Sequence, residues 1–367
     1  MLVQRPGVRS PVPKHTAHLV AALGSLGCTV VTHPWGRSRE GEPLRSKLTQ
    51  RLRDVLSVRR ALQGQEFDVA VVKTAHDWHT VLRDIAAVLV IRRRCRPVVL
   101  QLHGSRPSSL VKPGYRAFKL ATAALLALVD GVLVLSTEEE REWRAFRRRP
   151  PVLTVKNPYV RLPSSPRASA STSTPDARAL FVGRLMWEKG IFELVEALPK
   201  VLDQTECNLV MVGEGNQEQE LRDRIHHLDL DDHVTMTGYL SGSELSNIYR
   251  EATMFVLPTS WFEGFPTVLA EAMDAGLPII TTPIRGAADY LVASEHALFV
   301  DPEDVDGLAS AMIVLLHDPD LRARMGSANR ERVQIFEPGV VAAEYLEILQ
   351  TLIREQRPDQ AAVSEGQ

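Results

Sequence analysis

Residues 258–278 read PTSWFEGFPTVLAEAMDAGLP and decide how the whole chain is interpreted. They follow a short apolar run at 254–257 that is typical of a buried strand, and their second half has the composition of a helix. We expect this helix to begin at Thr267 and to end at Gly276, because glycine is favoured just past a helix end. The stretch therefore predicts a strand, a loop and a helix in immediate succession.

The start of this helix predicts an anion site, because its first N–H groups and the helix dipole present positive charge there. Glu271 lies on the second turn, where a carboxylate can accept hydrogen bonds from two vicinal hydroxyls of a sugar ring. Glu263 lies in the preceding loop and can meet the group on the other side of a bound phosphate. The pattern favours a nucleotide-sugar pocket; a solvated helix after a Gly-Phe-Pro turn is the alternative.

A second strand, loop and helix occurs at 181–190, FVGRLMWEKG. Gly183 permits an unusual turn, and Arg184 and Lys189 both follow the strand closely. Paired cations at this position can hold a diphosphate and stabilise it as a leaving group. Ordinary surface cations are the alternative interpretation.

His103 ends a third strand, 98–102, and precedes Gly104. A histidine at the end of a strand can hydrogen-bond a substrate hydroxyl or transfer a proton. A purely structural histidine is the alternative.

Strands and helices alternate along the chain, which predicts parallel sheets covered by helices on both faces. The predicted helices are 15–26, 191–203, 217–228, 243–251 and 305–317, and only residues 1–4 are available for a strand before the first helix. The predicted strands are 29–32, 69–73, 97–102, 131–135, 152–156, 179–182, 208–212, 234–237, 254–257, 279–281 and 297–300.

A Ser/Pro/Thr-rich segment at 163–176 predicts a linker between two domains, 1–170 and 171–367. Residues 1–170 hold 29 Lys and Arg against 12 Asp and Glu, a balance of +17, whereas residues 171–367 hold 14 against 33, a balance of −19. A basic half-molecule implies an anionic partner or surface. We expect a ligand between the two domains, at the carboxyl ends of their strands.

Other signals exclude several classes of protein. The three cysteines form no CxxC pair, which argues against a zinc module or a disulfide framework and favours the cytoplasm. Residues 76–79, HDWH, predict a helix start better than metal ligands, and the acidic residues Asp229 and Asp231 predict a solvated connection. The glycines at 213–215 are a poor match to a dinucleotide fingerprint, and no nucleic-acid motif is present.

The apolar run 120–135 is interrupted by Asp130-Gly131, so we interpret it as a helix and a buried strand rather than a membrane span. Basic residues gather at 92–96, 106–119 and 144–149. Cations beside an apolar helix suit an anionic bilayer surface, and solvated helix faces are the alternative. We therefore expect a cytoplasmic protein, or one that is peripheral at the inner face of the membrane.

Four motifs together resemble glycosyltransferase family 4, whose members are retaining enzymes with the GT-B fold. They are Gly183-Arg184-(x)4-Lys189-Gly190, Val212-Gly213-Glu214-Gly215, Thr237-Gly238, and Glu263-(x)7-Glu271 with Gly264-Phe265-Pro266. Weaker landmarks in the first domain are Leu102-His103-Gly104, Val134-Leu135-Ser136 and Lys156-Asn157-Pro158. The resemblance implies two facing, doubly wound Rossmann-like domains with a cleft between them, in which the last helix can pack back on the first domain.

The resemblance also implies roles for particular residues. Arg184 and Lys189 would hold the donor's diphosphate, Glu271 its ribose and Glu263 the transferred sugar, while His103 would line the sugar site from the first domain. The donor-binding set is Gly183, Gly264, Phe265, Pro266, Thr267, Val268 and Glu271. No metal or other cofactor is expected.

One departure from the family pattern lies at residues 10–14, SPVPK, where the family has a Gly-Gly turn. Proline has no N–H to donate, so no residue before His103 is assigned to the site.

The sequence thus predicts a hexosyltransferase that uses a UDP- or GDP-sugar and a glycolipid or polysaccharide-precursor acceptor. Glycosylation of a small molecule, or binding of a nucleotide sugar without catalysis, are the alternatives.

Overall fold

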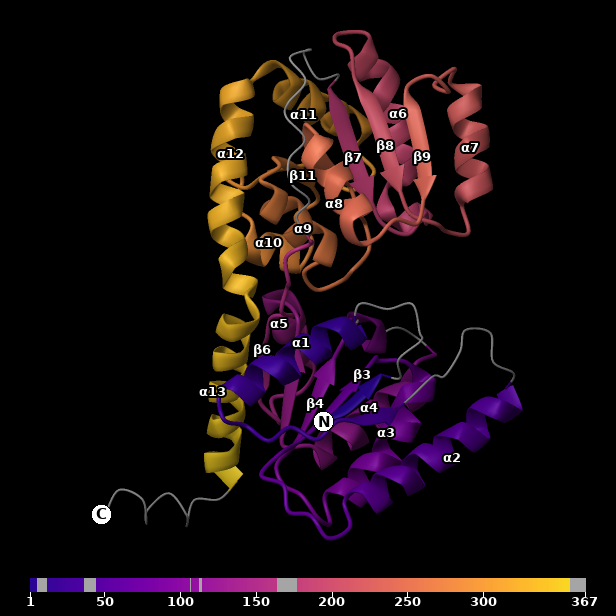
Figure 1. Ribbon diagram of the computed structural model, residues 1–367. Helices are drawn as coiled ribbons and strands as arrows, with labels where there is room; N and C mark the ends of the chain where they lie inside the picture. The colour runs from indigo at the N-terminus through magenta and orange to yellow at the C-terminus, as the bar shows by residue number, and fades with distance from the viewer. Residues whose placement is uncertain (5–11, 36–43, 106, 112–113, 164–176, 357–367) are drawn as a thin grey trace. The chain divides into compact units, whose positions relative to one another are not determined.

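The computed structural model describes the chain except for residues 5–11, 36–43, 106, 112–113, 164–176 and 357–367 (Figure 1). It divides into two units, each built around one six-stranded sheet. Unit 1 comprises Met1–Tyr159, Phe262–Gly264 and Phe336–Gln367, and unit 2 comprises Val160–Trp261 and Phe265–Ile335. All but the first residue of the segment predicted as a linker lies outside the described residues.

The sheet of unit 1 has the strand order β2-β1-β3-β4-β5-β6, and its pairs are parallel. Its strands are β1 (Leu2–Gln4), β2 (His33–Trp35), β3 (Ala70–Thr74), β4 (Val98–Leu102), β5 (Gly131–Val134) and β6 (Val152–Thr154). Its helices are α1 (Val12–Ser25), α2 (Leu44–Ala61), α3 (Trp78–Ile91), α4 (Arg116–Leu128), α5 (Thr137–Phe146) and α13 (Pro338–Gln356), with a 3-10 turn η1 at Pro107–Val111.

The strands of unit 1 are apolar on both faces because each face is covered by helices. Leu100 and Leu102 of β4 belong to a core built with α2 to α5. Val99 belongs to a second core, on the opposite face, to which α1 and α13 contribute Leu19 and Val341. The alternation along one strand therefore assigns each residue to one of two helix layers.

Helix α13 belongs to unit 1 although the helix before it in the chain belongs to unit 2. It lies beside α1, and its buried Tyr345 donates a hydrogen bond from the hydroxyl to Gln101 Oε1 at 2.9 Å (Figure 1). Leu352 of α13 packs closely on Gly131 of β5: a Cβ added to Gly131 would lie 2.8 Å from the Cδ1 of Leu352.

One predicted strand in unit 1 is wrong. The sequence favoured 29–32, whereas the strand forms at His33–Trp35 and pairs with β1, from Leu2↔His33 to Gln4↔Trp35. The register follows Trp35, which is 1% exposed and lies under the guanidinium of Arg83 at 4.0 Å. Three of the four residues at 29–32 are exposed instead, so β-branched composition alone placed the strand too early.

The sheet of unit 2 has the order β12-β11-β10-β7-β8-β9 and is also parallel. Its strands are β7 (Arg178–Val182), β8 (Asn208–Val212), β9 (Val234–Gly238), β10 (Met254–Leu257), β11 (Ile279–Thr281) and β12 (Ala297–Phe299). Its helices are α6 (Ile191–Leu202), α7 (Glu218–His227), α8 (Gly242–Glu251), α9 (Thr267–Ala275), α10 (Gly286–Tyr290), α11 (Val305–His317) and α12 (Pro319–Arg332). Two 3-10 turns, η2 (Trp187–Lys189) and η3 (Val333–Phe336), complete the order of elements.

The four helices predicted in this half are confirmed as α6, α7, α8 and α11, with ends that differ by at most one residue. The run 120–135 is likewise confirmed as the end of a helix, α4, followed by a buried strand, β5. Among the described residues, no helix is both long and apolar enough to cross a bilayer.

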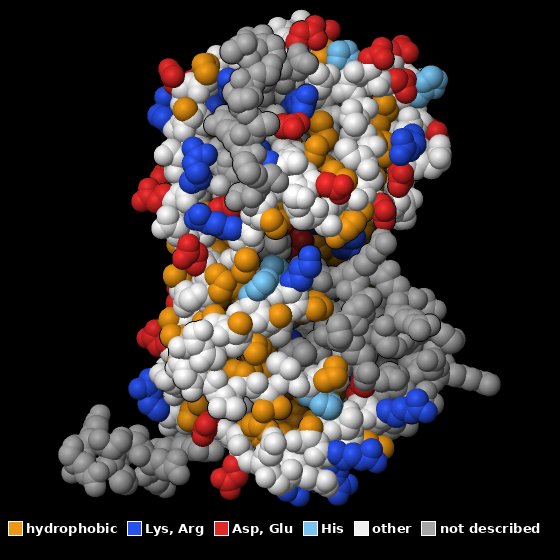
Figure 2. Space-filling model, viewed as in Figure 1, with side chains coloured by type: hydrophobic (Ala, Val, Ile, Leu, Met, Phe, Trp, Pro, Cys, Tyr) orange, Lys and Arg blue, Asp and Glu red, His pale blue; other side chains and the backbone are white. Residues whose placement is uncertain are grey.

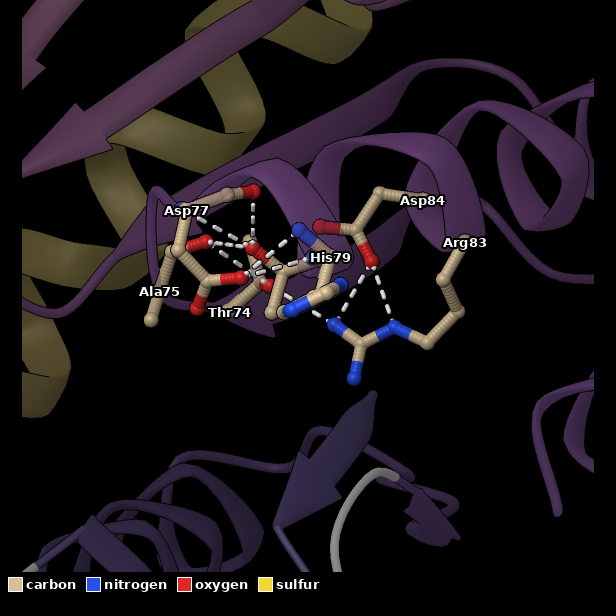
Figure 3. Close-up of polar contacts among 7 residues, drawn as sticks. Thr74, Ala75, Asp77, His79, Arg83 and Asp84 are labelled. Carbon is tan, nitrogen blue, oxygen red and sulfur yellow. Dashed lines mark hydrogen bonds and ion pairs between the residues drawn. The ribbon is translucent and has the colours of Figure 1, made fainter. Parts of the chain in front are cut away.

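The stretch at 76–79 is confirmed as a helix start (Figure 3). The Asp77 carboxylate accepts hydrogen bonds from the backbone N–H groups of His79 and Thr80, both at 2.9 Å, and the Thr80 hydroxyl accepts one from the N–H of Asp77 at 3.1 Å. This capping box satisfies N–H groups that the first turn of α3 would otherwise leave unpaired. One turn further on, Arg83 pairs with Asp84 and donates to the Thr74 hydroxyl, which ties α3 to the end of β3.

Replacing the cap tests its contribution to stability. Asp77→Ala should lower the free energy of unfolding by about 1 kcal/mol, the usual cost of losing an N-cap side chain. Urea unfolding followed by circular dichroism measures the change, with Glu66→Ala as the control because Glu66 is exposed. Equal stability of the two variants would show that the cap contributes nothing.

Candidate functional site

The strand order of unit 2 reverses between two neighbouring strands. From β7 the chain proceeds to β8 and β9 on one side of the sheet, and from β10 it proceeds to β11 and β12 on the other. In open parallel sheets, ligands bind at this switch point, outside the carboxyl ends of the strands. The loop after β7 carries Arg184 and Lys189, and the loop after β10 leads into α9. Both predicted motifs therefore lie at the switch point.

The loops after β7, β8 and β10 contact one another through their backbones, and two glycines make this possible. Gly190 has a φ of +71°, and a Cβ there would lie 2.1 Å from the carbonyl oxygen of Pro258. Gly213 has a φ of +143°, and a Cβ there would lie 1.8 Å from the carbonyl oxygen of Gly183. Side chains at these two positions would force the loops apart, which explains the glycines in two of the predicted motifs.

Hydrogen bonds fasten the same loops. The carbonyl oxygen of Glu188 accepts from the N–H of Ser260 at 2.9 Å and from the Thr259 hydroxyl at 3.1 Å. Lys189, the next residue, is only 8% exposed, whereas the Arg184 side chain is exposed. The lysine is therefore held in place by its surroundings, and the arginine is accessible to a ligand.

Helix α9 has the bounds that the sequence predicted, Thr267 to Ala275, with Gly276 at its end in the left-handed conformation. The residue before it, Pro266, has an extended backbone and makes no side-chain capping bond. The dipole of α9 favours an anion at this end, which is close in sequence to the loop fastened to Glu188.

Glu271 is oriented by a residue that the sequence analysis did not identify. The hydroxyl of Tyr249 on α8 donates to Glu271 Oε2 at 2.8 Å and lies 3.3 Å from the carbonyl oxygen of Val268. Tyr249 is 1% exposed and stacks near Phe255 of β10. No motif marks Tyr249, because its role depends on α8 packing against α9.

In unit 1, His103 directly follows β4, and its N–H donates to the carbonyl oxygen of Thr74 at 2.9 Å. Its Nε2 atom is buried and has no hydrogen-bond partner among the described residues. Burial lowers the pKa of His103 well below its usual value, and the nearby Lys73 and His15 lower it further. The imidazole is therefore neutral at physiological pH, and it can donate or accept a hydrogen bond.

A buried carboxylate braces the loop after His103. Glu139 Oε1 accepts from the N–H and the hydroxyl of Ser105, at 2.9 and 2.6 Å, and Oε2 accepts from the N–H of Leu135 at 3.2 Å. Trp143 adds a hydrogen bond from its indole N–H to the Ser105 hydroxyl. One side chain of α5 thus fixes the loops that follow both β4 and β5.

Glu263 and Gly264 lie in the short segment that belongs to unit 1. Gly264 packs against Leu135, where a Cβ would lie 2.5 Å from the Leu135 Cβ, and Glu263 is half-buried. The other residues that the sequence predicts to bind the donor, from Gly183 to Glu271, lie in unit 2. That Glu263 and His103 join them in one site remains a prediction.

Within the described ranges, no group of three acidic, histidine or cysteine residues could hold a metal ion. His76 packs against Phe118 and Trp143, and burial lowers its pKa to about 4. Asp231 pairs with His226 at 2.9 Å. The absence of a metal requirement stays a prediction.

Comparison with known proteins identifies the family. The model described as Glycosyltransferase Family 4 matches residues 12–159, and that described as Glycosyl transferases group 1 matches residues 167–332. The chain therefore belongs to glycosyltransferase family 4, as its motifs predicted. The two doubly wound parallel sheets are those of the GT-B class, and the predicted fold class is confirmed.

The similar proteins vary in length and activity. The chain is 29% identical over 258 residues to a putative teichuronic acid biosynthesis glycosyltransferase of Bacillus subtilis, which covers 68% of this chain and 62% of that protein. Sucrose-phosphate synthase from Thermosynechococcus elongatus superposes with a TM-score of 0.75, at 20% identity over 93% of both chains. HepE of Anabaena, solved in complex with UDP and glucose, has a TM-score of 0.71, at 17% identity over 95% of this chain and 98% of that one. The chain spans only 43% of the length of an uncharacterised glycosyltransferase of Methanocaldococcus jannaschii and 41% of that of glycogen synthase from Mycobacterium tuberculosis.

The close contact at Gly190 yields a direct test. Gly190→Ala should lower the melting temperature by several degrees, because the Cβ meets a carbonyl oxygen and left-handed backbone disfavours alanine. Differential scanning calorimetry measures the change. Gly24→Ala is the matched control, since a Cβ there meets no atom within 4 Å, and its melting temperature should not fall. Similar melting temperatures for both variants would contradict the proposed loop packing.

Proposed function

We propose that this protein is a retaining glycosyltransferase that moves a hexose from a nucleotide sugar to a glycolipid or polysaccharide-precursor acceptor. The observation that carries the proposal is the position of Arg184 and Lys189 in a loop fastened to the loop before α9, at the switch point of unit 2. Two cations and the amino end of a helix match the charge of a diphosphate.

In the proposed reaction, Arg184 and Lys189 stabilise the charge that develops on the departing diphosphate. The bond between the anomeric carbon and the phosphate oxygen breaks, and the acceptor oxygen bonds to the same face of that carbon. The acceptor's proton passes to the departing phosphate oxygen, so no enzyme nucleophile is required. Glu271 binds the ribose, in an orientation fixed by Tyr249.

The remaining proposed contacts concern the transferred sugar. Glu263 accepts hydrogen bonds from its hydroxyls, and His103 lines the same site. UDP is the first nucleotide to test, because HepE was solved with UDP and glucose. GDP is the second.

Two substitutions test the donor site. Lys189→Ala should reduce turnover by about 100-fold or more, because a cation on the leaving group is lost, and Glu271→Gln should weaken UDP affinity about tenfold. Isothermal titration with UDP and GDP, and nucleotide release from a panel of UDP- and GDP-sugars, measure the two effects.

Lys200→Ala is the matched control, because Lys200 lies on the exposed side of α6 and pairs with Asp306. Binding without turnover of any donor would favour a non-catalytic nucleotide-sugar-binding protein. Loss of thermal stability in Lys189→Ala, with donor binding intact, would show that the lysine is structural.

We also propose that unit 1 binds an anionic membrane surface through α3 and α4, which pack against each other. Large apolar side chains on or next to these helices are exposed to solvent, and a group of such side chains on one surface can mark an interaction site. This α3–α4 surface comprises Trp78, Leu82, Leu89, Tyr115 and Leu120, with exposed fractions of 42, 51, 46, 46 and 73%.

Cations accompany the α3–α4 surface. Arg93 and Arg94 follow the end of α3, and Arg116 and Lys119 lie on α4; all four are exposed. Figure 2 shows further Lys and Arg side chains at the lower edge of unit 1 in this view. Exposed apolar and aromatic residues beside cations are the combination that binds anionic bilayers.

Vesicle binding tests this surface. Leu120→Ser and Trp78→Ser should each weaken co-sedimentation with vesicles of phosphatidylglycerol and phosphatidylcholine, and wild-type binding should fall as salt rises, because salt screens surface charge beyond about 8 Å at physiological strength. Val314→Ser is the control, as Val314 is 47% exposed in unit 2. Salt-independent binding, or an equal loss in the control, would contradict the proposal.

A further inference from the structure

Unit 1 contains a buried lysine that the proposed mechanism does not use. Lys73 is the fourth residue of β3, on the face of the sheet covered by α1 and α13, and it is 4% exposed. Its Nζ donates to the Thr16 hydroxyl on α1 at 3.2 Å. Within the part of the chain that the structure describes, no carboxylate pairs with this ammonium group. An isolated buried charge is costly, so its surroundings should explain it.

Two histidines accompany Lys73 at the same edge of the sheet. His103 follows β4, the strand that pairs with β3, and its buried Nε2 has no partner among the described residues. His15 is 7% exposed on the first turn of α1, and its Nδ1 donates to the carbonyl oxygen of Pro158 at 2.8 Å. Lys73 and His15 both lower the pKa of His103 electrostatically, and Lys73 lowers that of His15.

The other titratable groups around Lys73 add no negative charge. The terminal amine of Met1, before β1, is a base whose pKa is lowered to about 6 by burial. Tyr345 of α13 is a neutral phenol whose pKa burial raises, and its hydroxyl is bonded to Gln101, the residue paired in register with Lys73. The cluster is thus rich in donors and contains no described anion.

We propose that Lys73, Thr16 and His103 bind a phosphate group carried by the acceptor. The terminal oxygens of a phosphate can accept from an ammonium, a hydroxyl and an imidazole N–H together. The site lies at the carboxyl ends of β3 and β4, where parallel sheets bind ligands. Next to His103, a Cβ at Gly104 would meet no described atom within 4 Å.

The assignment of this phosphate to an acceptor rests on the proposed function. The phosphate site itself can be tested without a donor. Inorganic phosphate is titrated into the full chain at pH 6.5 with saturating UDP, which occupies the diphosphate site of unit 2. Binding is followed by calorimetry and by the imidazole resonances of His15 and His103. We expect phosphate to bind and to shift both sets of resonances.

Two variants locate the binding. Lys73→Met should weaken phosphate affinity about tenfold or more, as expected for loss of a charged hydrogen bond, and Thr16→Val should weaken it less. Lys200→Met, on the exposed side of α6, should bind phosphate as the wild type does. No phosphate binding by the wild type, or unchanged binding by Lys73→Met, would overturn the proposal. Phosphate binding at Lys73 in a protein that binds neither UDP nor GDP would instead overturn the proposed donor site alone.

The pH dependence gives an independent readout. Burial lowers the pKa of Lys73 from 10.5 to about 7. The folded protein therefore loses this charge as pH rises past about 7, and its affinity for phosphate should fall there. Between pH 7 and 10.5 the unfolded chain binds more protons at Lys73 than the folded chain does, so wild-type stability should rise with pH there. Lys73→Met should lack that rise and should melt at a higher temperature than the wild type at pH 6.5. A variant that melts lower, or an affinity that is constant with pH, would count against the site.

Discussion

The contact between backbones at the carboxyl ends of β10, β7 and β8 is the constraint on which the proposed donor site of unit 2 depends. At Gly190 and Gly213, the space that a side chain would fill is occupied by the carbonyl of a neighbouring loop. Because the loops touch directly, Lys189 and the loop before α9 are fixed relative to each other by main-chain atoms rather than by long side chains. A site built this way is preorganised for a ligand whose charge is compact.

Unit 1 positions its loops through a side chain. The loops after β4 and β5 are held by a buried carboxylate, Glu139, which accepts hydrogen bonds from both. The adjacent cluster around Lys73 and His103 carries charge without a described counterion. The contrast is physical: Arg184 of unit 2 is exposed at a glycine-lined switch point, whereas Lys73 of unit 1 is buried under α1 and α13.

The sequence predicted most of the fold, because strands buried on both faces are continuous apolar runs and because Thr267 and Gly276 mark both ends of α9. It misplaced β2, since the burial of Trp35 under Arg83 is a long-range contact that no local pattern reports. It also missed Tyr249 and Lys73. Tyr249 acts through the packing of α8 on α9, and Lys73 stands at the end of a predicted strand. A charged residue after three apolar ones in AVVKT is the available signal for Lys73.

The return of α13 to unit 1 has a consequence for how such proteins can be taken apart and recombined. Unit 1 is assembled from three separate stretches of chain, and Tyr345 and Leu352 complete its core from the far end of the sequence. In a chimaera that exchanges only the amino-terminal half, the sheet of unit 1 would therefore come from one protein and its covering helix α13 from the other. Recombination between relatives should preserve the fold only when the first and last segments are inherited together.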